Sequence, residues 1–177
     1  MLDRILDAHK LLSQCSNFVS CKKIVVYTSR LGLKYFFWKN MNSNIINRLE
    51  VLVKKMYYIH QRFQIYSTFA LLYHEEPLSV IELSKYVRLS DQFMPIDSHH
   101  YFIIFAFTAQ DDAYKASQNI IYKLDKHFHS DDGCFIAVDS FDINKSPQSV
   151  LNRLKQILIQ TRKESYSRVE TEDILER

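Results

Sequence analysis

Glycine is scarce in this chain, which has only Gly32 and Gly133 among its 177 residues. The P-loop and the Rossmann fingerprint each need several glycines, because only glycine allows their tight turns and the close approach of backbone to phosphate. The scarcity therefore excludes the nucleotide-binding enzymes that depend on glycine-rich loops.

The chain also has little cysteine and no long apolar run. Cys15, Cys21 and Cys134 cannot all pair with one another, and none belongs to a Cys-x-x-Cys motif, so we expect reduced thiols in a cytoplasmic protein. No apolar stretch approaches the roughly 20 residues that span a bilayer. The first residues lack the pattern of a signal peptide. We expect no membrane span.

Charge and hydrophobicity are moderate. Hydrophobic residues make up 47% and charged residues 24% of the chain, an ordinary balance for a folded protein. The net charge of +3 suits binding of an anionic small molecule, but it is far below that of a dedicated nucleic-acid-binding protein. We expect a soluble protein with no nucleic-acid partner.

Residues 1–62 are predicted to form an N-terminal helical segment with one short strand. The spacing predicts a helix over residues 2–14, a strand over Lys22–Thr28, and a long helix after residues 42–44. Apolar residues along the long helix recur in steps of four and three, which defines a heptad seam. The seam either packs on its own domain or forms a homodimer contact. Its residues are Ile45, Leu49, Leu52, Met56, Ile59 and Phe63.

The hydrophobic pattern changes near residue 63 and predicts a second domain over residues 63–177. The predicted order is strand, helix, strand, strand, helix, strand, followed by a further helix and a short strand. Ser79 and Glu82 form a capping box, and Ser146-Pro147 is typical of a helix start. This order predicts an α+β fold of the ferredoxin-like, split βαβ type, with an antiparallel sheet and helices on one face. The strands are expected at residues 64–74, 93–96, 101–107, 134–141 and 166–169.

Two motifs within this order resemble those of the GGDEF domain of diguanylate cyclases. Arg88-Leu89-Ser90-Asp91 supplies an RxxD motif at the end of a predicted helix. Asp97-Ser98-His99-His100-Tyr101 then falls on the Gly-Gly-Asp-Glu-Phe positions of the following hairpin without a gap. Residues 163–169 are similar to the family's closing helix-to-strand segment. The resemblance covers residues 64–172 and implies a bacterial signalling protein with the family's fold.

The same resemblance implies that the catalytic residues are missing. The family's motif needs its glycines for the approach of GTP and its acidic residues for a divalent metal. Asp97 and Ser98 stand at the glycine positions, and His99 and His100 stand at the acidic ones. The strand over residues 64–74 also lacks the family's metal-binding aspartate. Because imidazole is a poor ligand for Mg²⁺, we expect no cyclase activity, no cofactor and no enzyme function.

One ligand site is retained according to the resemblance. In the family the RxxD motif binds cyclic di-GMP as an inhibitory ligand, and Arg88 and Asp91 are therefore predicted to bind it. An arginine can donate to the guanine edge or to phosphate, and an aspartate can accept from guanine N–H groups. The family's following arginine is Pro95 here, which removes one cationic contact. The alternative for the pair is an exposed ion pair at a helix end.

These observations lead to two functional hypotheses. The first is a catalytically inactive regulatory domain that binds a protein partner and senses cyclic di-GMP. The alternative is a purely structural interaction module of a larger complex, with no nucleotide ligand. An enzyme with a transition metal at His99, His100, His127 and His129 is disfavoured, because adjacent strand residues point to opposite faces of a sheet.

Overall fold

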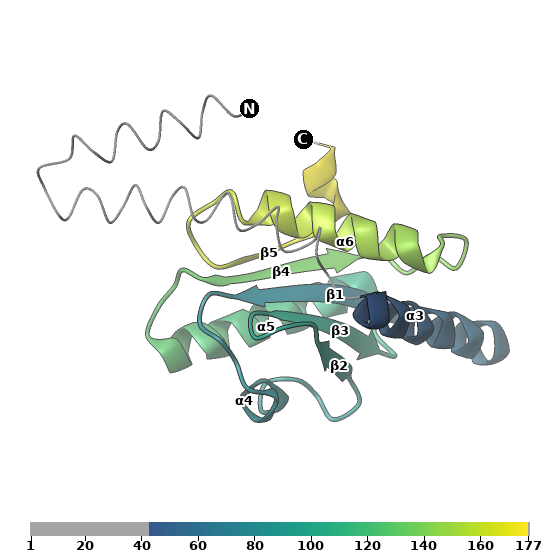
Figure 1. The fold of residues 1–177 in the computed structure, drawn as a ribbon, viewed down its shortest axis with the longest axis horizontal. Helices are drawn as coiled ribbons and strands as arrows, with labels where there is room; N and C mark the ends of the chain where they lie inside the picture. The colour runs from purple at the N-terminus through teal and green to yellow at the C-terminus, as the bar shows by residue number, and fades with distance from the viewer. Residues whose placement is uncertain (1–42, 177) are drawn as a thin grey trace, which may run out of the picture. The chain divides into compact units, whose positions relative to one another are not determined.

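The computed structural model describes residues 43–176 (Figure 1). The helix expected at residues 2–14 and the strand expected at Lys22–Thr28 lie outside the described residues. In chain order the elements are α3 (Ser43–Phe63), β1 (Ser67–His74), α4 (Val80–Ser84), β2 (Gln92–Pro95), β3 (His100–Ala106), α5 (Gln110–Phe128), β4 (Cys134–Asp139), α6 (Pro147–Thr161), β5 (Arg168–Glu170) and the 3₁₀ helix η1 (Glu172–Leu175).

The five strands form one sheet in the order β2-β3-β1-β4-β5. The central strand β1 is antiparallel to both β3 and β4, and β2 is antiparallel to β3, whereas β5 runs parallel to β4. Strands β1, β3 and β4 are buried along almost their whole length, as their nearly unbroken apolar sequences predict. The predicted α+β fold and its order of strands and helices are confirmed. The sheet was expected to be antiparallel, but it is mixed, because β5 runs parallel to β4.

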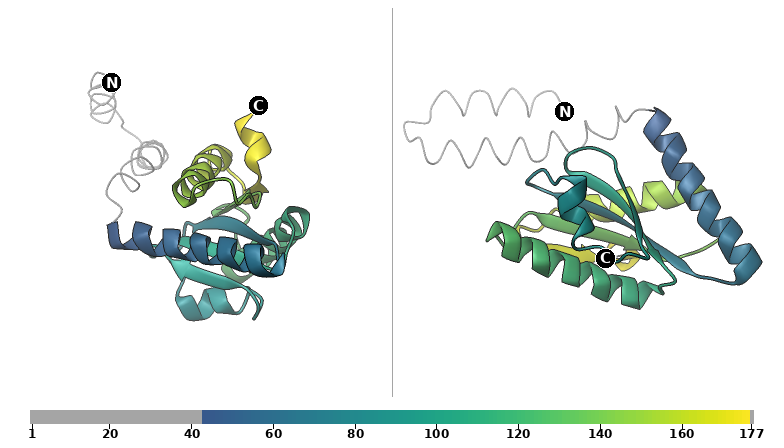
Figure 2. Two further views of the ribbon diagram at one scale, coloured as in Figure 1. Left: turned by 90° about the vertical axis from the view of Figure 1, so that its right-hand side faces the viewer. Right: turned by 90° about the horizontal axis from the view of Figure 1, so that it is seen from below.

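Helices cover both faces of this sheet, which differs from the expectation of helices on one face (Figure 2). Helices α4 and α5 pack on the face that carries Ala70 of β1. On the other face, Tyr57 of α3 contacts the ring of Phe69 edge-on at 6.3 Å, and α6 lies over β4 and β1. Since neighbouring strand residues point to opposite faces, a strand that is apolar at every position needs cover on both. The core on the α5 side comprises Ala70, Leu72, Leu78, Leu83, Tyr101, Ile103, Phe105, Ala113, Ala116, Ile120, Ile121, Leu124, Cys134, Ile136, Val138 and Val169.

Helix α3 belongs to the compact unit that contains the sheet, and this unit begins at Ser43. The hydrophobic pattern of the sequence predicts a domain boundary at residues 62–63, where the helical period gives way to a strand. The buried residues of α3 are Leu49, Val53, Met56 and His60. Two members of the heptad seam, Leu49 and Met56, therefore pack on their own domain, while Phe63 is 63% exposed.

Local sequence signals explain where the other helices begin. The side chains of Ser79 and Glu82 form the predicted capping box at α4, each accepting a hydrogen bond from the other's backbone N–H. Ser146 caps α6 by accepting from Ser149 N, directly before the first helical residue Pro147. Helix α5 starts later than Thr108, whose hydroxyl instead donates to Ala106 O at 2.7 Å.

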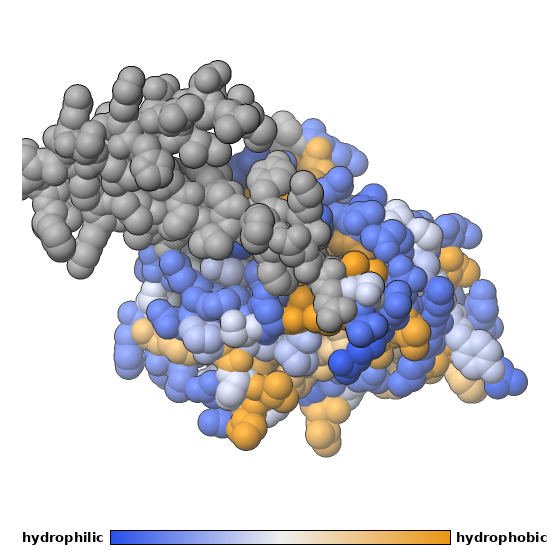
Figure 3. All heavy atoms as spheres, in the orientation of Figure 1, coloured by the Kyte–Doolittle hydropathy of each residue, from blue (hydrophilic) through white to orange (hydrophobic). Residues whose placement is uncertain are grey.

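The surface carries apolar side chains among a majority of polar ones (Figure 3). Apolar side chains stand out over α4 and the loop that follows it, where Val80, Ile81 and Leu89 are at least half exposed. Among the described residues, no helix combines the length and the apolar character that crossing a membrane requires.

Candidate functional site

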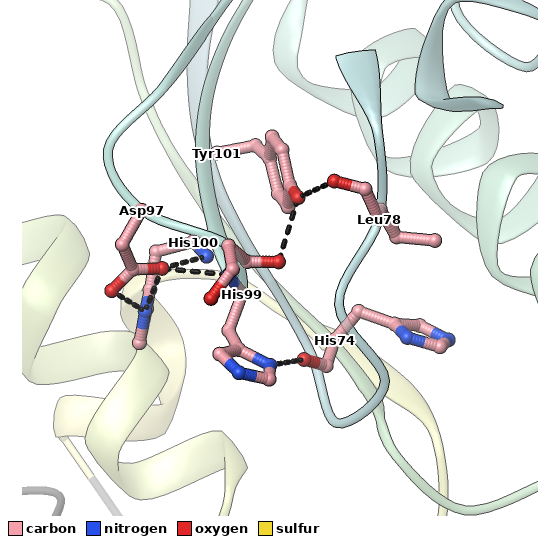
Figure 4. Close-up of polar contacts among 7 residues, drawn as sticks. His74, Leu78, Asp97, His99, His100 and Tyr101 are labelled. Carbon is pink, nitrogen blue, oxygen red and sulfur yellow. Dashed lines mark hydrogen bonds and ion pairs between the residues drawn. The ribbon is translucent and has the colours of Figure 1, made fainter. Parts of the chain in front are cut away.

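The hairpin turn between β2 and β3 is held together by the carboxylate of Asp97 (Figure 4). Asp97 Oδ1 accepts hydrogen bonds from the backbone N–H groups of His99 and His100, both at 2.7 Å. The backbone closes the turn from the other side, because Ile96 N donates to His100 O at 2.8 Å. Hydrogen bonds to the Asp97 carboxylate thus stabilise this tight turn, whereas a glycine-rich turn relies on backbone conformations that only glycine adopts easily.

His100 binds the same carboxylate from the inner side of the turn. Its Nδ1 lies 3.0 Å from Asp97 Oδ2 and 3.1 Å from Oδ1, and its ring packs against that of Tyr73 at 5.0 Å. Burial favours a raised pKa for Asp97, but the side chain of His100 and the backbone N–H groups of His99 and His100 outweigh it. The pKa of Asp97 is therefore held below its ordinary value.

His99 ties the turn to the end of the central strand. Its Nδ1 lies 3.0 Å from His74 O, and since a carbonyl oxygen only accepts, Nδ1 carries the hydrogen. In the opposite direction, His74 N donates to His99 O at 2.9 Å. The imidazole of His99, which falls on an acidic position of the GGDEF motif in the sequence comparison, is thus hydrogen-bonded to strand β1.

Tyr101 fastens the loop after β1 to the turn. Its hydroxyl hydrogen is shared between the carbonyl oxygens of Leu78 and Ser98, with the Ser98 contact at 2.8 Å. Leu78 N donates to Ser98 O at 3.1 Å, so backbone and side chain join the same two segments. Burial raises the pKa of Tyr101, and the hydroxyl is therefore a donor at neutral pH. Together with Asp97, His99 and His100, these contacts define what we call the braced turn, residues 97–101.

The braced turn does not fit a magnesium site. Mg²⁺ requires several oxygen ligands in near-octahedral order. Asp97 is the only acid in residues 97–101, and its carboxylate is already engaged by two backbone N–H groups and by His100. Across residues 43–176, no group of three or more His, Cys, Asp or Glu side chains is arranged to hold a metal ion.

The two residues of the RxxD motif have different surroundings. Arg88 is exposed, and no ion pair joins it to another side chain in the part of the chain that the structure describes. Asp91 is 9% exposed, and its Oδ1 accepts from Ala106 N and from Ser90 Oγ, both at 3.2 Å. The other oxygen, Asp91 Oδ2, is buried with no hydrogen-bond partner among the described residues. Burial raises the pKa of Asp91 despite these hydrogen bonds and the nearby charge of Arg88.

Asp91 therefore also has a structural role that the spacing did not predict. By accepting from the last residue of β3, it closes the open end of the β2–β3 pair opposite the braced turn. The alternative for this pair, an exposed ion pair between Arg88 and Asp91, is not formed, because Asp91 is buried and its carboxylate accepts from Ala106 N and Ser90 Oγ. Cyclic di-GMP binding by the two residues stays a prediction.

Sequence reasoning missed a buried ionic cluster at the end of β4. Asp139 is fully buried. Its Oδ1 accepts a hydrogen bond from Arg153 Nε at 3.2 Å and lies 3.9 Å from Lys145 Nζ. Its Oδ2 has no hydrogen-bond partner among residues 43–176. Burial raises the pKa of Asp139 although both cations oppose the shift. The hydroxyl of Tyr57 is also buried without a partner among those residues, and burial together with Asp142 and Asp139 raises the pKa of Tyr57 to about 12. The only sequence signal was an acid at the end of an apolar strand.

Other side chains considered from the sequence do not come together. His127 lies 4.0 Å from Glu82, and His129 is exposed at the end of α5. Cys134 is fully buried in β4, and burial raises the pKa of its thiol well above the ordinary value. It therefore has the character of an inert core thiol.

Comparison with solved structures identifies the fold as GGDEF-like. The GGDEF domain of DgcB from Caulobacter crescentus, in complex with cyclic di-GMP, matches with a TM-score of 0.54 and 9% identity over 68% of this chain and 86% of that chain. The GGDEF domain of FimX from Pseudomonas aeruginosa matches with a TM-score of 0.54 and 15% identity, over 72% and 91%. The diguanylate cyclase SiaD from the same organism, in complex with its activator SiaC, matches with a TM-score of 0.56 and 10% identity, over 96% and 82%.

No protein-family model matches the chain, and a search of curated proteins finds no match. At identities of 9–15% the structural likeness concerns the fold alone. The suspected resemblance to GGDEF domains is thus supported by the fold, and the chemistry has to be argued from the residues themselves.

Proposed function

We propose that this domain is a catalytically inactive, GGDEF-like regulatory domain that acts by binding a protein partner. The observation that carries the proposal is the braced turn, in which Asp97 stabilises its own hairpin and His99 is bonded to strand β1. A turn whose polar groups are engaged internally offers neither metal ligands nor mobile donors to a triphosphate. The domain is thus suited to binding and not to nucleotide condensation.

Two observations support a protein partner. SiaD, which shares the fold, was solved in complex with its activator SiaC. In the present chain, the segment from α4 to the RxxD motif exposes Val80, Ile81 and Leu89, with Leu89 fully exposed. Large exposed apolar side chains in one short segment are a feature of protein contact surfaces.

Cyclic di-GMP at Arg88 and Asp91 is the second part of the proposal. DgcB, another protein with this fold, was solved in complex with that dinucleotide. Here Arg88 is exposed next to Leu89, so a ligand at this position would lie beside the proposed partner surface. Asp91 keeps one oxygen, Oδ2, without a hydrogen-bond partner among the described residues, although that oxygen is buried.

An assay of cyclase activity tests the first part. The full chain is incubated with GTP and Mg²⁺, with the diguanylate cyclase SiaD as the positive control, and cyclic di-GMP is quantified by mass spectrometry. We expect no product above the protein-free background. Formation of cyclic di-GMP that disappears in the Asp97→Ala variant would overturn the proposal.

Calorimetry and thermal denaturation test the nucleotide part. Cyclic di-GMP at 100 times its dissociation constant would stabilise the fold by about 2.7 kcal/mol. We expect Arg88→Ala to abolish this effect, and Lys85→Ala, an exposed cation on the same segment, to preserve it. Absence of heat and of any thermal shift for the unsubstituted chain would favour the alternative of an interaction module without nucleotide.

The partner surface is tested by affinity capture, in which the full chain and its Leu89→Asp variant each serve as bait. Proteins captured by the unsubstituted chain are expected to be lost with Leu89→Asp and kept with Tyr122→Asp, a control at an exposed position of α5. An identical set with both variants would contradict this surface. Homodimer formation through the heptad seam and a cytoplasmic location stay predictions, and light scattering of the full chain measures the first.

A further inference from the structure

An apolar groove of about 470 Å³ lies between the first half of α3 and the edge strand β2. Its floor is formed by Phe102 and Ile104, which belong to the core and are 1% exposed. Val51, which is 63% exposed, stands on the α3 side. The lining residues are Asn47, Arg48, Val51, Leu52, Gln92, Phe93, Met94, Phe102 and Ile104.

Among the lining residues that the structure describes, one carries a charge, and that charge is positive. Arg48 contributes to the lining and forms no ion pair with any other residue that the structure describes. Asn47 and Gln92 add neutral amide groups that can donate and accept hydrogen bonds. None of the described lining residues is acidic. An apolar hollow with one cationic group is complementary to a molecule with an apolar body and an anionic head.

The dimensions of the groove favour a small molecule. The α3 residues that line it, Asn47 to Leu52, span about 7.5 Å of helix, and the three lining residues of β2 span about 7 Å of strand. A partner helix that docks through a repeated apolar face would need a groove of several turns. A volume of about 470 Å³ lies in the range of small-molecule sites.

We propose that this groove binds a small amphiphilic anion, such as a medium-chain carboxylate, with its chain on Phe102 and Ile104 and its head group at Arg48. The groove lies on the α3 face of β2, and its lining does not include any residue of the RxxD motif or of the braced turn. The site is therefore separate from the one proposed for cyclic di-GMP, and either proposal can fail without the other.

Calorimetry of the full chain with decanoate, below its critical micelle concentration, is the first test. Each buried methylene strengthens transfer from water by up to about fourfold, so decanoate is expected to bind more tightly than octanoate. Decyltrimethylammonium carries the same chain with the opposite charge and is expected to bind at least fivefold more weakly. Equal affinity of the two charge types, or no binding of decanoate, would overturn the proposal.

Substitutions locate the site. Val51→Trp fills the groove and is expected to weaken decanoate binding by more than tenfold, whereas Val80→Trp adds the same bulk at an exposed position of α4 and is expected to leave it unchanged. Arg48→Gln is expected to cost about fivefold, the effect of a partly exposed ion pair, and Lys55→Gln on the same helix to cost nothing.

Circular dichroism confirms that each variant folds, and amide chemical shifts of the unsubstituted chain locate the ligand independently of the variants. Shift changes centred on Leu52, Met94 and Phe102 are expected. Changes centred elsewhere would refute the proposal. So would displacement of decanoate from these residues by an acidic amphipathic peptide that binds more tightly, because the groove would then be a protein-docking surface.

Discussion

The hydrogen bonds of Asp97 make a quantitative prediction about the hairpin. In Asp97→Ala, the backbone N–H groups of His99 and His100 lose an acceptor at 2.7 Å, and the imidazole of His100 loses its carboxylate partner. Loss of a comparable side-chain cap at a helix terminus costs about 0.5–2 kcal/mol, and charged acceptors lie in the upper part of that range. The side chain of Asp97 is 28% exposed, so water replaces part of the interaction.

We therefore expect Asp97→Ala to lower the free energy of unfolding by about 2 kcal/mol, or the melting temperature by roughly 4–8 °C for a chain of this size. Asp97→Asn keeps an oxygen acceptor without the charge and is expected to lose about half as much. Ser98→Ala is the matched control, because Ser98 takes part through its backbone, and it is expected to change stability by less than about 0.5 kcal/mol.

The pH dependence of this difference tests the cause. Because the folded pKa of Asp97 is lowered, its stabilising effect is present above the unfolded value near 3.9 and is lost as the pH falls through the folded value. Urea denaturation followed by circular dichroism at pH 7 and pH 3 is the assay. The reasoning about the braced turn is refuted by a loss below 0.5 kcal/mol at pH 7, or by a loss that does not shrink in acid.

Three further substitutions test other parts of the domain. Burial raises the folded pKa of Asp139, so the contribution of Asp139 to folding stability is present in acid and is lost as the pH rises. In urea denaturation, Asp139→Asn is therefore expected to gain stability relative to the unsubstituted chain between pH 4 and pH 8. A stability difference that stays constant over this range would contradict the argument. Gly133 has φ +129°, and an added Cβ would lie 3.1 Å from Glu75 Cβ. Gly133→Ala is therefore expected to lower the free energy of unfolding by about 1–3 kcal/mol in a thermal melt. An unchanged melting temperature would contradict this. Tyr101→Phe removes the hydroxyl that donates to Ser98 and is expected to cost about 1–2 kcal/mol in the same melt, so a loss below 0.5 kcal/mol would show that this hydroxyl does not brace the turn.

Those parts of the fold that depend on short-range sequence could be predicted. The capping box of Ser79 and Glu82 involves residues three apart, and Ser146 directly precedes the helix that it caps, so both are visible in a short window. The hairpin was also predictable, because a polar turn separates two strand-like runs. The RxxD motif was expected at the end of a helix running to about Val87, but α4 ends at Ser84, so the motif lies in the loop between α4 and β2.

The roles of individual polar side chains could not be predicted, because they depend on contacts that are distant in sequence. Asp91 binds the backbone of Ala106, fifteen residues away, and His99 binds the carbonyl of His74, twenty-five residues away. The cover on the second face of the sheet was missed for the same reason. A heptad seam on α3 shows that one side of the helix is apolar, but it does not say whether that side meets a sheet or a second copy.

The braced turn also bears on what a glycine-rich sequence would do at this position of the fold. Writing Gly-Gly-Asp-Glu-Phe over residues 97–101 would delete the Asp97 acceptor, the imidazole of His99 that holds β1, and the Tyr101 hydroxyl that holds the loop after β1. The first effect of this replacement would be a loosened hairpin and not a metal site. A design that introduces these five residues therefore also requires the loop at residues 75–79 to change, so that new contacts replace those of His99 and Tyr101.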